Sequence, residues 1–167
     1  MKPAVVLLVL LLLLLPGCSS DTTASPTPTP APTSAPAQAQ DSWLAMAPED
    51  VRAFEGPGGQ LLLIFVDETY DIDGTYASAL TWRLGDDYTT DYFVEDDSGD
   101  LWWYGRRGSW RAGRHGEQPR LVLDAATADE RTVVEFGDLA VTLERGSGPV
   151  RVETRQGAYE PDASAGT

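Results

Sequence analysis

Apolar and polar residues alternate along the C-terminal half of the chain. In the segments 131–136, 139–145 and 150–155, apolar side chains recur at every second position between polar or charged neighbours. Successive side chains of a strand point to opposite faces of a sheet, so this alternation predicts antiparallel strands with one buried and one wet face. Clusters rich in Gly and Asp separate the segments and indicate turns.

Five further segments upstream predict strands. The run QLLLIFV at 60–66 is almost wholly apolar, and its length favours a strand buried on both faces. The other four are short and bounded by turn residues: 76–84, 89–95, 101–105 and 120–125. Short strands at this spacing predict a mostly β fold, namely a single small antiparallel sandwich or barrel-like domain.

One short helix is expected at the N-terminal side of this domain. The segment MAPEDVRAFEGPGG begins at Met46 and places Pro48 in a first helical turn, where the two acids that follow suit the positive end of the helix. Val51 and Phe54 are three residues apart, so they would share the buried side. Gly56 and the proline after it would end the helix.

The strongest hairpin pattern is DYFVEDDSGDLWWYG at residues 91–105. A three-residue Asp-Ser-Gly loop, with its glycine in the left-handed conformation, would pair Val94 with Trp102. Two positions further along, Tyr92 would face Tyr104. This register puts those four side chains on one face of the hairpin and separates apolar from polar positions better than a two-residue loop does.

The two adjacent tryptophans of this hairpin must point to opposite faces of the sheet. We expect Trp102 to anchor the core. Trp103, together with Phe93, would then be either covered by another segment or exposed as a platform for ligand binding.

The first seventeen residues have the pattern of a secretory leader. A positive Lys2 precedes an apolar run from Ala4 to Leu15, which is too short to cross a bilayer. The sequence Leu-Pro-Gly-Cys that follows resembles a bacterial lipobox, which implies removal of residues 1–17 and lipidation of Cys18. Several acyl chains form a durable anchor, so we expect the protein at the extracytoplasmic face of the cell membrane.

Composition divides the remainder of the chain into three parts. Residues 18–40 begin with the lipidated Cys and form a tether rich in Pro, Thr and Ala, which lacks the apolar content needed to order it. Residues 41–155 make up the β-rich globular domain, which we expect to be monomeric. Residues 156–167 are small and polar and are expected to form a flexible tail.

The charge and residue inventory exclude several classes of function. The chain has 26 acidic against 12 basic residues, a balance that repels nucleic acid. Its only lysine is Lys2, its only histidine is His115 and its only cysteine is Cys18. Catalysis by a lysine or a Cys–His pair, and zinc sites rich in His or Cys, therefore lack the side chains they need. We therefore expect no catalytic residues, no metal site and no cofactor.

Acidic and basic clusters leave two alternatives open. Asp-rich turns at 71–73 and 96–100 could gather oxygens around Ca²⁺, although neither has the full spacing of a calcium loop and ordinary turns contain the same residues. Five arginines lie in 101–120, where Arg106 and Arg107 could hold an anion. Internal pairing of these arginines with the acid-rich strands is the simpler interpretation.

The segment 90–123 resembles a motif of uncharacterised secreted bacterial lipoproteins, chiefly actinobacterial. The motif runs D-x-x-G-x-x-W-Y-x-G, then G-S-W-x-A-G-x-x-G-x-Q-P. The resemblance implies a surface lipoprotein with a β-rich domain and transfers no catalytic residue. This chain departs from the pattern at Asp100, Arg106 and His115. The matching positions are Gly99, Trp102 or Trp103, Tyr104, Gly105, Gly108, Ser109, Trp110, Ala112, Gly113, Gly116, Gln118 and Pro119.

These observations favour a non-enzymatic, lipid-anchored module that binds an envelope glycan or protein, or that has a structural role in the envelope. Two other classes stay open. One is a hydrolase that cleaves cell-wall glycan through two carboxylates, and it would need a cleft with converging acids. The other is an adhesion module stabilised by Ca²⁺, and it would melt at a higher temperature when Ca²⁺ is added.

Overall fold

The computed structural model describes residues 41–163, which form eleven strands and no helix. The leader at 1–17, Cys18 and the tether lie outside the described residues. All strand pairs are antiparallel. The strands are β1 (Val51–Gly56), β2 (Gly59–Ile72), β3 (Thr75–Leu84), β4 (Asp87–Glu95), β5 (Leu101–Arg106), β6 (Trp110–Arg111), β7 (Arg120–Leu123), β8 (Arg131–Phe136), β9 (Leu139–Glu144), β10 (Gly148–Thr154) and β11 (Gly157–Pro161).

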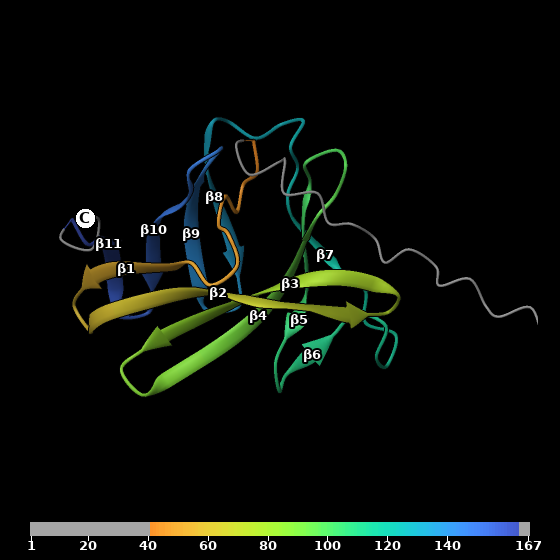
Figure 1. The fold of residues 1–167 in the computed structure, drawn as a ribbon, viewed down its shortest axis with the longest axis horizontal. Helices are drawn as coiled ribbons and strands as arrows, with labels where there is room; N and C mark the ends of the chain where they lie inside the picture. The colour runs from red at the N-terminus through yellow and green to blue at the C-terminus, as the bar shows by residue number, and fades with distance from the viewer. Residues whose placement is uncertain (1–40, 164–167) are drawn as a thin grey trace, which may run out of the picture. The chain divides into compact units, whose positions relative to one another are not determined.

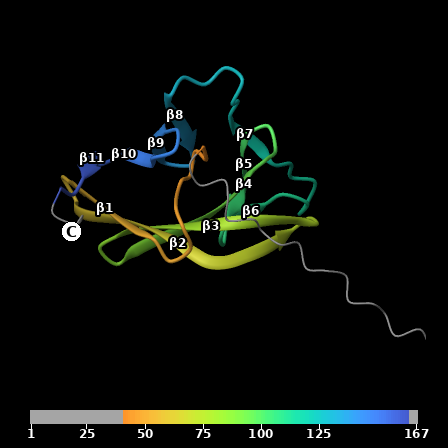
Figure 2. The same ribbon diagram turned by 45° about the horizontal axis from the view of Figure 1, so that its top comes forward.

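A single sheet with the strand order β6-β5-β4-β3-β2-β1-β11-β10-β9-β8 curls into a half-barrel, and β7 pairs with β5 beside β6 (Figure 1). Figure 2 shows β8–β11 along one arm of the curl and β4–β7 along the other, with the β7–β8 connection passing over the gap between them. The expected mostly β, antiparallel, barrel-like fold is therefore confirmed.

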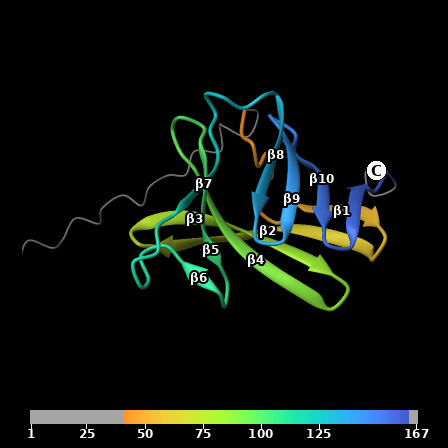
Figure 3. The same ribbon diagram turned by 180° about the vertical axis from the view of Figure 1, so that it is seen from behind.

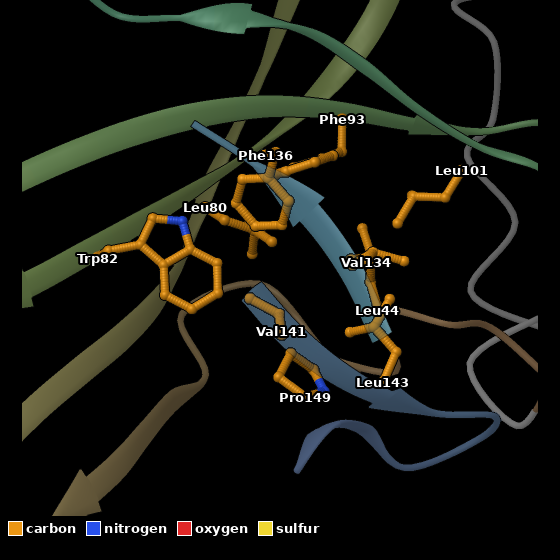
Figure 4. Close-up of a pocket in the computed structure, with 10 residues that line it drawn as sticks. All are labelled: Leu44, Leu80, Trp82, Phe93, Leu101, Val134, Phe136, Val141, Leu143 and Pro149. Atoms are coloured by element: carbon orange, nitrogen blue, oxygen red, sulfur yellow. The ribbon is translucent and has the colours of Figure 1, made fainter. Parts of the chain in front are cut away.

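The inner face of the curl is filled with large side chains from both arms. The ring of Phe136 on β8 lies 4.9 Å from that of Phe93 on β4 and 5.7 Å from that of Trp82 on β3. Among the side chains that Figure 4 labels, the free space is only about 10 Å³. That volume is about the minimum for one water molecule, so no ligand fits between the arms at this point.

The expected helix from Met46 is wrong. Residues 51–56 form β1, which pairs with both β2 and β11, and Pro57 and Gly58 make the β1–β2 turn. Phe54 is buried whereas Val51 is 57% exposed, as opposite faces of a strand require. So short a segment forms at most two helical turns, which are marginal alone, whereas strand pairing satisfies its backbone on both sides.

The expected flexible tail at 156–167 is wrong for its first residues. Residues 157–161 form β11, which joins β10 to β1 and thereby links the two arms of the sheet. Tyr159 is completely buried, and its hydroxyl accepts a hydrogen bond from the Gly58 backbone N–H at 3.1 Å. The domain therefore continues beyond the expected boundary at residue 155.

The hairpin at 91–105 forms with the expected three-residue loop, in which Gly99 has a φ of 83° and Val94 pairs with Trp102. The expected pairing of Tyr92 with Tyr104 is wrong, because a bulge shifts Tyr92 onto Gly105. The bulge leaves Tyr104 without a partner in the register. Both faces of the hairpin carry buried side chains, and Tyr92 itself is only 1% exposed.

The expectation that Trp102 anchors the core is wrong, and of the two alternatives for Trp103 the covered one is found. Trp103 lies in the core at 5% exposure, whereas Trp102 is half-buried and donates its indole N–H to Asp96 Oδ2 at 2.9 Å. Both faces of this hairpin carry large rings, so the local pattern does not decide which one turns inward. Contacts from distant strands decide it, because Phe136 of β8 packs against the side that holds Trp103.

The segment that precedes β1 packs into the same core. Trp43 is completely buried, and its backbone N–H donates to Glu95 Oε1 at 3.2 Å, while Ser42 Oγ donates to Oε2 at 2.6 Å. Arg52 on β1 clamps this segment from the other side, because its guanidinium donates to the carbonyl oxygens of Ala45 and of two residues in the β9–β10 region. The described chain is thus held firmly to the domain at its N-terminal end.

Candidate functional site

One acid is completely buried in the domain. Asp91 sits in the middle of β4, and its carboxylate receives two hydrogen bonds from Arg106 on β5: Nε to Oδ1 at 2.8 Å and Nη2 to Oδ2 at 3.0 Å. The indole N–H of Trp103 donates to Oδ1 at 3.0 Å. Such bidentate pairing is the arrangement that allows a carboxylate to remain buried.

Opposing effects act on the protonation of this carboxyl group. Burial raises the pKa of Asp91, and the hydrogen bonds and charge of Arg106 offset part of that effect, as does the indole of Trp103. Trp82 also favours the ionised form, although its buried Nε1 forms no hydrogen bond of standard geometry. Burial thus favours the protonated form of Asp91, and Arg106 favours the ionised form. The side chain has no exposed surface through which it could exchange a proton with a substrate.

The guanidinium of Arg106 also joins the two arms of the sheet. Gly137, in the β8–β9 turn, has a φ of 59°, and a Cβ added at this position would collide with the guanidinium group. The absence of a side chain at Gly137 therefore lets the turn lie directly against Arg106. The Arg106 side chain is 19% exposed, so one edge of it still reaches the surface.

A cleft of about 140 Å³ opens at this edge. Residues at the end of the β3–β4 hairpin and in the β8–β9 turn line it. Figure 3 shows the strands β3, β4, β8 and β9 from behind the view of Figure 1. Its lining combines apolar residues, Trp82 among them, with residues that carry hydroxyl or charged groups. The lining residues are Leu61, Trp82, Leu84, Asp87, Tyr88, Thr89, Arg106, Asp138, Leu139 and Thr154.

Of the two alternatives for Phe93 and Trp103, the structure shows the covered one. Phe93 is 1% exposed and Trp103 is 5% exposed, so neither ring is available as a platform for a ligand. Arg106 turns inward to Asp91, in agreement with the simpler interpretation of internal pairing. Arg107, its neighbour, is exposed, and its positive charge acts on Tyr70. The two arginines therefore do not form one anion site.

The segment that follows β5 folds back on the outer face of the sheet. Ala112 is buried there against Tyr92, and Arg111 donates to the Tyr92 hydroxyl at 2.9 Å with its guanidinium 4.8 Å from the ring centre. Gly105, with a φ of 146°, lies so close to the backbone of Trp110 that a Cβ would collide with it. The positions of the lipoprotein-like motif thus act here mainly in backbone turns and packing.

The aromatic rings of this segment are covered by arginine. Trp110 packs edge-on against Trp103 with a centroid distance of 4.8 Å, and the Arg120 guanidinium lies 4.2 Å from the Trp110 ring centre. Cation–π contacts of this kind stabilise partly exposed rings. The crowding of tryptophan and arginine between 101 and 120 is therefore explained by internal packing.

The acid-rich turns are ordinary turns in the described part of the chain. Asp96 Oδ1 accepts backbone N–H groups of Ser98 and Asp100, and Asp71 Oδ1 accepts that of Gly74. Among residues 41–163, no group of three or more Asp, Glu, His or Cys side chains is arranged to hold a metal ion. The described residues also contain no helix long and apolar enough to cross a membrane.

In comparisons with protein-family models, curated proteins and solved structures, no match to this chain was found.

Sequence reasoning missed the buried ion pair and the cleft. A usable signal existed for the pair: Asp91 is a lone acid in the middle of an aromatic, β-branched strand, where Asp is normally depleted. A charge at such a position must find a buried partner, and Arg106 occupies the facing strand. The cleft gave no comparable signal, because its residues come from six strands and the turn between β8 and β9.

Proposed function

We propose that this protein is a lipid-anchored component of the extracytoplasmic face of the cell membrane, and that its β domain binds an envelope ligand without chemical conversion. The leader pattern that ends at Cys18 and the resemblance to secreted lipoproteins support the location. The tether would hold the domain away from the membrane, where it could reach other envelope components.

The sealed position of Asp91 is the observation that favours binding over hydrolysis. A general acid must lie within hydrogen-bond reach of its substrate and have a raised pKa. Asp91 has the raised pKa, but it is completely buried and both of its oxygens accept hydrogen bonds from Arg106. The cleft beside Arg106 combines aromatic, hydroxyl and carboxylate groups, which suits recognition of a polar ligand.

Two measurements on the full chain test this proposal. In a bacterial host, the wild type should partition into detergent and incorporate labelled fatty acid, whereas Cys18→Ser should do neither. Incubated with purified cell-wall material, the chain should sediment with it and release no reducing ends over time. Fatty-acid labelling of the Cys18→Ser variant would refute the anchor. Release of soluble reducing ends would favour the carboxylate-pair hydrolase instead.

A further inference from the structure

We infer that the cleft between the β3–β4 hairpin and the β8–β9 turn binds a positively charged aminoalkyl group of an envelope ligand, of the kind that a lysine side chain carries. This inference rests on the proposed function and adds the place and the chemical class of the ligand. The carboxylate of Asp87 would bind the ammonium group, and the leucines of the cleft would pack against the alkyl chain.

The residues that carry this site lie on one face of the sheet. Leu61 pairs with Leu84, and Leu84 pairs with Asp87, so the three form one row across β2, β3 and β4. The next row on the same face contains Trp82 and Thr89, which also pair directly. Leu61 and Trp82 are buried, which identifies this face as the inner one. Asp87 therefore points to the side on which the cleft opens, and all five residues line it.

Three acids occupy inner positions of β4, and only one of them lacks a partner in residues 41–163. Asp91 is paired with Arg106, and Glu95 accepts two hydrogen bonds from the segment that precedes β1. Asp87 is exposed and forms no side-chain hydrogen bond or ion pair with the described residues. A ligand ammonium group can donate charge-assisted hydrogen bonds to this carboxylate and thereby supply the partner that the fold does not provide.

The charges around the cleft favour a cation over an anion. The guanidinium of Arg106 is neutralised by Asp91, and Asp138 is paired with Arg155 at 2.8 Å. Asp87 is left as the uncompensated charge of the lining, and it attracts a cation and repels an acidic ligand. The chain as a whole has a formal net charge of −14, so its field also draws cations toward the domain.

The rest of the lining suits an alkyl chain better than a ligand rich in hydroxyl groups. Leu84 and Leu139 offer apolar contacts on the two sides of the cleft. The hydroxyl of Thr154 is already bonded to the backbone at the β10–β11 turn, and the ring of Tyr88 points to the opposite face of β4. The cleft has a volume of about 140 Å³, and a cavity of about 150 Å³ accommodates benzene. A linear aminoalkyl group, which has slightly fewer non-hydrogen atoms than benzene, therefore fits.

The experiment compares amino-acid derivatives that differ in the charge of the side chain. The full chain in detergent micelles is titrated with the N-acetyl methylamides of lysine, norleucine and glutamate, and backbone amide shifts are followed by NMR. We expect saturable shifts at residues 84–89 and 138–139 with the lysine derivative, with a dissociation constant on the order of 1 mM. The norleucine derivative lacks the charge and should bind about tenfold more weakly. The glutamate derivative should not bind.

Butylamine carries the same ammonium and alkyl groups without a peptide, and it distinguishes the two sources of the ligand. Binding weaker than that of the lysine derivative would assign the site to a side chain of a peptide or protein. Tighter binding would assign it to a free amine. Either result supports recognition of the aminoalkyl group itself.

A matched pair of variants locates the site. Asp87→Asn should weaken binding of the lysine derivative about tenfold through loss of the charged acceptor. Asp86→Asn changes the neighbouring exposed acid, which does not line the cleft, and should alter binding by less than about twofold. Both side chains are exposed, so both variants should keep the melting temperature of the wild type. Added salt should weaken binding to the wild type more than to Asp87→Asn.

Three results would overturn the inference: no saturable shift with the lysine derivative or butylamine, equal binding of the norleucine derivative, or equal losses in Asp87→Asn and Asp86→Asn. These outcomes are distinct from failure of the proposed function. A chain that is labelled with fatty acid at Cys18 and sediments with cell-wall material, but shows no shifts in the cleft, would retain its function and lose only this site.

Discussion

The buried pair of Asp91 and Arg106 can be dissected by a double-mutant cycle. Arg106→Met removes the cation but keeps the length of the side chain, and it leaves a completely buried carboxylate with only Trp103 as a donor. Removing one member of a buried pair costs about 3–5 kcal/mol. The described domain has 123 residues, so about 3–5 °C per kcal/mol predicts a fall in melting temperature of about 10–20 °C.

The double variant Asp91→Leu/Arg106→Met should recover most of this loss. An apolar pair of similar volume needs no mutual neutralisation, and such replacements are often neutral or even stabilising. Thermal unfolding followed by tryptophan fluorescence measures all four members of the cycle. Arg114→Met, a change at an exposed arginine of the same segment, is the control and should alter stability by no more than about 0.5 kcal/mol.

The cost of Arg106→Met should also depend on pH. Without the guanidinium, burial raises the pKa of Asp91 with less opposition. A carboxyl group whose pKa is higher in the folded than in the unfolded state stabilises the fold below the unfolded value of about 3.9. That contribution is lost as the pH rises through the folded value. The deficit should therefore be smaller at pH 4 than at pH 8.

Two results would refute this reasoning about the pair. One is a loss below about 1 kcal/mol in each single variant, which is the range of a solvent-exposed ion pair. The other is a deficit in Arg106→Met that grows as the pH falls, since that would mean that the variant domain prefers the ionised carboxylate.

Three further variants test the packing of the domain, each by its melting temperature. Gly137→Ala should destabilise the domain more than Gly85→Ala. Both glycines have a φ near +60°, but only the added Cβ at Gly137 meets the Arg106 guanidinium. Equal losses in melting temperature would show that backbone strain alone matters. Trp103→Ala should cost about 3–5 kcal/mol and Trp102→Ala clearly less, since only the former empties the core; the reverse order would restore the expectation from the sequence. Arg52→Lys should lower stability because one ammonium cannot reach all the carbonyl oxygens that the guanidinium spans; an unchanged value would show that this clamp is dispensable.

The strands were largely predictable because their signals are local. Turn residues and alternation placed β3, β4, β5 and β7–β10 within a few residues of their observed positions. The hairpin loop was predictable for the same reason, because a glycine with positive φ closes it. The pattern does not show which of the two apolar faces of the hairpin turns toward the core. Contacts with Phe136 on the distant strand β8 decide this.

The two wrong predictions at the ends of the domain, the helix from Met46 and the tail from residue 156, have a similar cause. A segment as short as β1 has weak intrinsic preference, and its strand conformation depends on partners from both β2 and β11. β11 has one large apolar side chain, Tyr159, among small, acidic and proline residues, so its sequence resembles a tail. The buried position of Tyr159 is formed only when the sheet is assembled.

The central claim is that the tryptophan hairpin belongs to the fold, with Trp103 in the core and Trp102 at its surface. Hydroxyl-radical footprinting of the full chain measures that claim residue by residue. We predict strong oxidation of Tyr76 and Tyr88, intermediate oxidation of Trp102 and protection of Trp103. Oxidation of Trp103 at the rate of Trp102 would contradict the account.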